Sequence, residues 1–369
     1  MFVIPEREPD KRIQRLKDEG VHLYSFSMLS TINQCLYDAW ATYVAHDRGL
    51  SSAYAEMGTC LHEITEDVIS GTAQTSDMPH ALKEGLVNID ILGLDFPKDF
   101  RGEDSIRTRW IADMEHFCKT FYPPKGEYDV EKLLVYRISP TRAIRGYADL
   151  IRKNADGTVS IFDLKTSSNY KQEDLLEHGR QLTIYGMALE QEGYTVKSTA
   201  WIMMKYVELR YDWYATRRSK AKTPLVKVVN RSKIYGTLRE PVLAACRSAG
   251  MDEPDIDIAM MDFANTNIMS DQFPEEVRGL FSIKPYVRNY PFTKELKEEA
   301  LAYIDRTADL YESLDQNQDE PWPSRTISKD CEFFCHMLCG HRNTCPHIKE
   351  YDRLNAIPDV PELSDDDLF

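Results

Sequence analysis

The sequence predicts an α/β protein, and two neighbouring patterns carry this prediction. Residues 145–152 and 158–164 are short runs rich in Ile, Val, Phe and Tyr, and Asn154-Ala155-Asp156-Gly157 lies between them. Two such runs around a turn signal are typical of a β-hairpin. Residues 175–192, which follow the hairpin, are expected to form a helix. The chain has 369 residues, and its 42% hydrophobic content is enough for a real core.

Other elements can be placed in order along the chain. Residues 104–121 have apolar side chains at helical spacing, and Pro123-Pro124 is expected to end that helix. Further helices are expected at residues 27–46, 58–69 and 293–314, and further strands at residues 132–138 and 198–207. Residues 71–102 are expected to be loop-rich, and residues 220–285 show no clear pattern. No run approaches eighteen apolar residues, so no membrane span is expected.

The hairpin carries three charged side chains of interest. Side chains alternate faces along a strand, so Asp163 and Lys165 share one face beside the strand that carries Asp149. Two carboxylates and an ammonium on one face can hold a divalent cation and a water. Mg²⁺ takes a few carboxylates and keeps open positions for phosphate oxygens and water. Such an ion lowers the pKa of the bound water and neutralises charge on a phosphate. Lys165 could orient or deprotonate that water.

Gly146-Tyr147-Ala148-Asp149, then Asp163-Leu164-Lys165-Thr166, then Gln181 and Tyr185 in a Gln-x-x-x-Tyr pattern resemble motifs of the PD-(D/E)XK nuclease superfamily in its RecB-like branch. That branch also has a histidine upstream, and Gly58-Thr59-Cys60-Leu61-His62 is in the right order. The resemblance implies a restriction-endonuclease-like core, with a mixed central sheet flanked by helices and preceded by a helical region. It also implies a set of metal ligands, namely His62, Asp149, Asp163 and the Leu164 carbonyl.

The resemblance further implies that Lys165 is the catalytic lysine. Gln181 and Tyr185 lie one helical turn apart, on one face of the helix, and would match the accessory motif near the scissile phosphate. Glu66, four residues after His62, could support that histidine.

Cysteine usage is the second signal. Four of the eight cysteines are scattered and four fall within fifteen residues, namely Cys331, Cys335, Cys339 and Cys345. The polar first ten residues do not resemble a signal peptide, so a cytoplasmic chain without disulfides is expected. A dense cysteine run in such a chain indicates metal ligation. Thiolates suit zinc or an iron–sulfur cluster, and zinc competes because His336, His341 and His347 are interleaved.

The cysteines also resemble those of the iron–sulfur CRISPR-associated RecB-like exonucleases and the AddB nuclease domain. These hold a [4Fe-4S] cluster by one upstream cysteine, which Cys35 matches, and three downstream ones. The family's downstream spacing is usually Cys-x2-Cys-x5-Cys. Only the gap from Cys339 to Cys345 matches it. There are four downstream thiols for three places, and which of them is spare stays open. The cluster would crosslink a loop of about 300 residues, which favours stability in the simple entropy model.

Charge is distributed unevenly. The net charge is −15, yet residues 213–239 contain no acidic side chain. Basic side chains neutralise phosphates and neighbouring aromatic rings can stack on bases, so this stretch is a candidate nucleic-acid site. Its first cations are Arg217, Arg218, Lys220 and Lys222.

The last six residues are acidic and end in an apolar pair, Ser364-Asp365-Asp366-Asp367-Leu368-Phe369. They resemble the C-terminal tip of bacterial single-stranded DNA-binding proteins, which docks on replication and repair partners. The alternative is a tail that only increases solubility, as most acidic tails do.

These patterns give an expected organisation of five segments. They are a helical region (1–125), a nuclease core (126–215), a basic and irregular insertion (216–290), a helix with the cysteine cluster (291–350) and an acidic tail (351–369). The expected function is a Mg²⁺- or Mn²⁺-dependent DNA nuclease, an exonuclease on free or single-stranded ends, in recombination, repair, phage DNA processing or CRISPR adaptation. The alternatives are a nucleic-acid-binding or anti-defence protein with this fold but no cleavage, and a zinc-stabilised scaffold.

Overall fold

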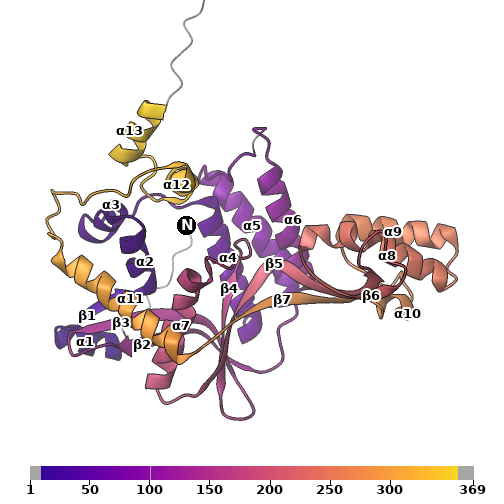
Figure 1. Ribbon diagram of the computed structural model, residues 1–369, viewed down its shortest axis with the longest axis horizontal. Helices are drawn as coiled ribbons and strands as arrows, with labels where there is room; N and C mark the ends of the chain where they lie inside the picture. The colour runs from indigo at the N-terminus through magenta and orange to yellow at the C-terminus, as the bar shows by residue number, and fades with distance from the viewer. Residues whose placement is uncertain (1–9, 100, 356–369) are drawn as a thin grey trace, which may run out of the picture. The chain divides into compact units, whose positions relative to one another are not determined.

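The computed structural model describes residues 10–99 and 101–355 (Figure 1). The described strands form one mixed sheet with the path β1-β3-β4-β5-β6, to which β2 adds beside β3 and β7 beside β5. The strands are β1 (His22–Ser25), β2 (Glu127–Arg137), β3 (Arg142–Lys153), β4 (Val159–Lys165), β5 (Val196–Tyr214), β6 (Lys222–Asn230) and β7 (Ser282–Tyr290). The expected α/β class with a mixed sheet flanked by helices is therefore confirmed.

Helices occur before, between and after the strands. They are α1 (Lys11–Asp18), α2 (Phe26–Gln34), α3 (Leu36–Ala39), α4 (Ala53–Ser70), α5 (Met78–Ile91), α6 (Ser105–Thr120), α7 (Leu175–Gln191), α8 (Ile234–Ser248), α9 (Glu253–Thr266), α10 (Glu275–Arg278), α11 (Lys294–Ser313), α12 (Lys329–Phe333) and α13 (Pro346–Asn355). Within the described residues no helix combines the length and the apolar character needed to cross a membrane.

The chain divides into two compact units. The first comprises the chain up to Phe26 together with Ala53–Asp305, and the second comprises Ser27–Ser52 together with the chain from Arg306. The first unit holds the sheet together with Cys60, Cys118 and Cys246, and the second holds the other five cysteines.

The expected hairpin forms the middle of the sheet in the first unit. β3 and β4 pair antiparallel, and the turn closes where Gly157 donates its N–H to the Asn154 carbonyl at 3.0 Å. β4 and β5 pair parallel, which requires a crossover, and α7 provides it. The core on which α4, α5 and α6 pack includes Met57, Leu82, Phe117, Leu150 and Leu164. These contacts fix α4 beside the ends of β3 and β4.

A second core lies where β5 runs on beyond the central sheet. The far half of β5 pairs with β6 from Tyr206↔Asn230 to Tyr214↔Lys222, and α8, α9 and α10 pack against it through residues such as Leu238 and Phe263 (Figure 1). We call this hairpin with its three helices the arm. Residues 220–285, which show no clear sequence pattern, are thus largely regular.

Two sequence expectations are wrong. Residues 71–102 are not loop-rich, because α5 occupies their middle, and Gly85 there lets α5 approach α4 closely: a Cβ at that position would lie 2.9 Å from Cys60 Sγ. Residues 27–46 are not one helix. Cys35 has extended backbone angles (φ −159°, ψ 117°) between α2 and α3, and a π-helical turn follows at Trp40–Val44.

Candidate functional site

The hairpin register brings the two predicted aspartates together. Leu150 pairs with Phe162, so Asp149 and Asp163 lie opposite each other at the next position of the two strands. The Leu164 N–H donates to Asp149 Oδ2 at 2.7 Å, which fixes that carboxylate against β4. Both aspartates are largely removed from solvent, with Asp163 only 2% exposed.

Helix α4 adds two further side chains to this place. His62 and Glu66 are one turn apart on α4, and His62 Nδ1 lies 3.5 Å from Asp149 Oδ2. One ligand atom from each of His62, Glu66 and Asp149 falls within 4.8 Å of the others. The His62 ring also donates to the Leu164 carbonyl. The three predicted ligands His62, Asp149 and the Leu164 carbonyl are thus adjacent.

Asp163 has a different neighbour. Its Oδ2 lies 2.7 Å from Lys165 Nζ as an ion pair, although the two are not aligned as a good hydrogen bond. Burial, the largest single effect, lowers the pKa of Lys165, but Asp163, with help from Tyr170 and Asp149, holds that pKa above its usual value. Lys165 is therefore a cation held against the site.

The electrostatics of this cluster favour a bound cation. Two further carboxylates, those of Glu66 and Asp163, and the Lys165 ammonium lie within electrostatic reach of Asp149. Burial, and then the nearby Asp163, raise the pKa of Asp149. Burial lowers the pKa of His62 to about 4, so at neutral pH its ring is neutral, the form that binds metals. Carboxylate oxygens, a neutral imidazole and a backbone carbonyl at one place are a donor set that fits a divalent cation.

The accessory pair from α7 lies beside the same strands. Gln181 Nε2 donates to Tyr185 Oη at 3.2 Å. Burial raises the pKa of Tyr185 to about 12, so its hydroxyl remains protonated. The ring packs against Gly146, where an added Cβ would lie 2.6 Å from Tyr185 Oη. The glycine of the Gly-Tyr-Ala-Asp motif is therefore needed for α7 to approach β3.

The predicted nucleic-acid cations lie elsewhere. Arg217, Arg218, Lys220 and Lys222 are exposed in and beside the turn between β5 and β6, and we call this group the arm tip. Lys165 pairs with Met203, and Tyr214 is eleven residues further along β5. At about 3.3 Å per residue the arm tip is roughly 36 Å along the strand from the aspartates. The structure does not bring these cations to the acidic cluster.

In the second unit, Cys35 and the four downstream cysteines come together as free thiols. Cys331, Cys335, Cys339 and Cys345 are buried, and Cys35 is half-buried at the start of α3. Burial raises the pKa of the Cys345 thiol, and the adjacent Cys339 and Cys35 thiols raise it further. The Cys331 sulfur is held by the backbone of the loop that precedes α12. It accepts from the Ser328 N–H at 3.3 Å and lies 3.6 Å from the Thr326 carbonyl.

Each interleaved histidine has an oxygen or aromatic partner, and His341 also contacts the Cys339 thiol. His341 is 2% exposed, and its ring nitrogens lie 2.7 Å from Asp38 Oδ1 and 3.1 Å from the Asp47 carbonyl. His336 is held by the Glu332 carbonyl and by Asp352 in the same manner. His347 packs edge-on against Tyr37, with ring centroids 5.2 Å apart. Asp38, Cys339 and His341 do have ligand atoms within 4.8 Å of one another. These three residues are therefore a second candidate metal group among the described residues.

The family model described as the PD-(D/E)XK nuclease superfamily matches residues 24–346 of this chain. No curated protein matches the chain. The family match spans the acidic cluster, the arm and the cysteines, and it agrees with the restriction-endonuclease-like fold expected from the motifs.

Proposed function

Because the chain belongs to the PD-(D/E)XK nuclease superfamily, we propose that it is a Mg²⁺- or Mn²⁺-dependent deoxyribonuclease. Its substrate is DNA with free or single-stranded ends, and it acts as an exonuclease. Recombination, repair, phage DNA processing and CRISPR adaptation are settings in which such an activity is used.

The observation that carries this proposal is the convergence of α4, β3 and β4 on one buried acidic cluster. His62 comes from α4, Asp149 from β3, and Asp163 with Lys165 from β4. These elements are distant in sequence, so their meeting at one point is a property of the fold. Burying neighbouring carboxylates is unfavourable without a cation, and such clusters are typical of functional sites.

Each residue of the cluster has a role in this proposal. His62, Asp149, Asp163 and the Leu164 carbonyl would hold the metal, with Glu66 beside them. A bound Mg²⁺ or Mn²⁺ supplies a water of lowered pKa and neutralises charge on the phosphate. Lys165, kept cationic by Asp163, orients the attacking water or donates to a phosphate oxygen. Gln181 and Tyr185 present an amide and a protonated hydroxyl from α7 near the scissile phosphate.

We further propose an iron–sulfur cluster in the second unit. The donor set fits, because five thiols gather there as free cysteines. Cys35, Cys335, Cys339 and Cys345 would be the ligands. Cys331 would be the spare thiol, since Cys35 and Cys339 are the thiols whose charges reach Cys345. This cluster would hold the start of α3 to the C-terminal helices.

The arm tip and the acidic tail have accessory roles in the proposal. The arm tip would contact DNA phosphates far from the cleavage point. The last six residues lie outside the described residues, and we propose them as a docking peptide for a replication or recombination protein.

End-labelled single- and double-stranded DNA incubated with protein purified without oxygen, with and without Mn²⁺, tests the proposal. Metal-dependent shortening of the labelled strand is expected. Binding without shortening would instead indicate a nucleic-acid-binding protein that keeps the fold. Zinc in place of iron in the purified protein would replace the iron–sulfur proposal and leave the nuclease proposal standing.

A further inference from the structure

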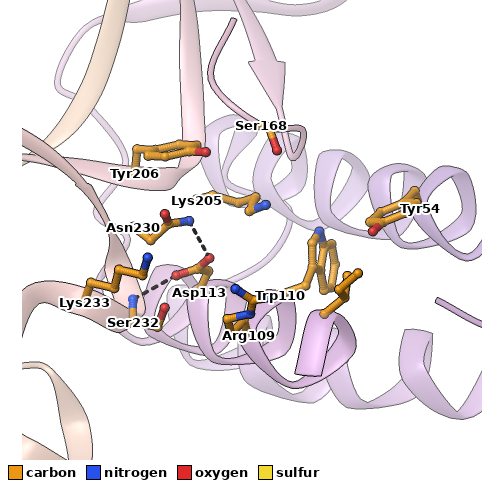
Figure 2. A pocket seen from close by; sticks show the side chains of 11 residues that line it. Tyr54, Arg109, Trp110, Asp113, Ser168, Lys205, Tyr206, Asn230, Ser232 and Lys233 are labelled. Carbon is orange, nitrogen blue, oxygen red and sulfur yellow. Dashed lines mark hydrogen bonds between the residues drawn. The ribbon is translucent and has the colours of Figure 1, made fainter. Parts of the chain in front are cut away.

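A polar pocket lies in the first unit where α6, the base of the arm and the loop after β4 meet. Its volume is about 260 Å³. Three cations from separate elements line it, namely Arg109 of α6, Lys205 of β5 and Lys233 before α8. Figure 2 shows Lys205, Tyr206 and Ser168 pointing toward the same space.

One carboxylate also lines the pocket, and its oxygens are already used. Asp113 accepts from Asn230 Nδ2 at 2.9 Å and from the Ser232 N–H at 2.8 Å (Figure 2). It is 2% exposed. Asp113 therefore ties α6 to the end of β6 and fixes the segment that carries Ser232 and Lys233. With this carboxylate included, the lining side chains carry a net charge of +2 in a chain of net charge −15.

The cations of the pocket have no close anionic partner in the described part of the chain. Among the described residues, none of Arg109, Lys205 and Lys233 forms an ion pair within 4.0 Å. Arg109 Nε donates to the Ser105 carbonyl, and Asp99 interacts with the Arg109 charge at longer range. Burial lowers the pKa of Lys205, and the more distant Asp113 opposes that shift only in part. A partly buried ammonium without a counter-ion is unfavourable, so an anion in the pocket would be stabilised.

The other polar groups of the pocket are mainly donors. Ser168, Ser232, Tyr54 and Tyr206 contribute hydroxyls. Tyr206 Oη accepts from the Asn169 N–H at 3.1 Å, which leaves its own O–H free to donate. Cations together with several hydroxyl donors match the oxygens of a phosphate group better than those of a base or a neutral sugar.

The pocket lies close to the acidic cluster. Ser168 follows Lys165 by three residues, which span at most about 11 Å of chain. Lys205 is two residues beyond Met203, the partner of Lys165 across β4 and β5. One strand of duplex DNA carries a phosphate about every 3.4 Å of helix axis, so this separation corresponds to roughly one to three nucleotides.

We propose that this pocket binds a phosphate group of the nucleic-acid strand within a few nucleotides of the bond to be cleaved. The inference rests on the proposed function, since it names where the substrate strand is held. Arg109, Lys205 and Lys233 neutralise the phosphate, and the hydroxyls orient it. Unlike the arm tip, this pocket is near enough to the acidic cluster to set the position of the strand at the catalytic centre. The phosphate is either an internal diester or a terminal phosphate, two sources of one chemistry.

Binding of short single-stranded oligonucleotides in EDTA, where metal-dependent cleavage cannot consume them, tests the proposal. The variant is Lys205→Gln with Lys233→Gln, and the matched control is Lys83→Gln, which removes an exposed lysine of α5 outside the pocket. The double variant is expected to bind about tenfold more weakly, as for the loss of charged hydrogen bonds. Its affinity should also depend less on salt, by about one unit of slope per lost contact. The control is expected to match the wild type.

Three oligonucleotides of one sequence distinguish the source of the phosphate. They carry a 5′-phosphate, a 3′-phosphate or hydroxyls at both ends. An equal loss of affinity for all three indicates an internal diester, and a loss confined to one indicates that terminal phosphate. Wild-type affinity and salt slope for all three would overturn the proposal. If the double variant does not fold, Lys233→Gln alone is used, because it removes an exposed ammonium. Weaker binding by this variant supports the proposal, and wild-type affinity and salt slope overturn it. Because the assay needs no cleavage, an inactive enzyme would refute the nuclease proposal without affecting this result.

Discussion

The contact between Gly146 and Tyr185 gives a quantitative test of how α7 sits on β3. In Gly146→Ala the new Cβ would lie 2.6, 2.7 and 3.0 Å from Tyr185 Oη, Cε1 and Cζ. The Tyr185 ring is 6% exposed and cannot move aside freely. Overpacking of this kind costs roughly 1–3 kcal/mol, and alanine in a strand recovers at most about 1 kcal/mol relative to glycine. We therefore expect Gly146→Ala to lower the free energy of unfolding by about 1–2 kcal/mol.

Urea unfolding of a double-mutant cycle measures this term. Tyr185→Leu removes the three contacting atoms and keeps most of the buried apolar volume. In that background Gly146→Ala should be nearly neutral, so the coupling free energy between the two positions should be about 1–2 kcal/mol. The same loss of stability from Gly146→Ala in both backgrounds would refute the packing of α7 against β3.

Three further predictions concern the cysteines, the arm tip and the buried aspartate. Cys331→Ser should leave iron content and melting temperature nearly unchanged, whereas Cys35→Ser should lower both; iron loss in Cys331→Ser would contradict the choice of spare thiol. Alanine at all four cations of the arm tip should weaken DNA binding and flatten its salt dependence without changing base preference, and an unchanged salt slope would exclude the arm tip from binding. The raised pKa of Asp149 makes its ionisation in the metal-free fold destabilising, so stability is lost as pH rises through that pKa. In EDTA, Asp149→Asn should therefore melt above the wild type at alkaline pH, and the difference should fade as pH falls; a lower melting temperature at pH 8 would contradict this.

Much of the acidic cluster could be predicted from short motifs. The hairpin follows from period-two apolar residues around Asn154-Ala155-Asp156-Gly157, and its register then brings Asp149 opposite Asp163 without further information. His62 required the family resemblance, because a lone histidine on a helix carries no signal of its own. The i, i+4 spacing between His62 and Glu66 is visible in the sequence. The approach of both side chains to Asp149 depends on how α4 packs on the sheet, which the sequence does not show.

The remaining features depend on tertiary packing. Gly85 in α5 looked like a loop residue, yet it serves the close approach of two helices. The break at Cys35 is a backbone conformation that helical spacing cannot reveal. The phosphate pocket draws single residues from α6, β5 and the segment after β6, and Arg109, Lys205 and Lys233 are each ordinary surface cations in the sequence. Only the fold shows that they converge.

The most direct test of the central claim is the single-turnover rate of DNA cleavage as a function of Mn²⁺ concentration, for wild type and Lys165→Ala. We expect a metal-dependent rate in the wild type. We expect Lys165→Ala to keep a similar half-saturating Mn²⁺ concentration, because the carboxylates remain, and to lose about a hundredfold or more of the maximal rate. Cleavage that needs no metal, or a Lys165→Ala variant as fast as the wild type, would contradict the account.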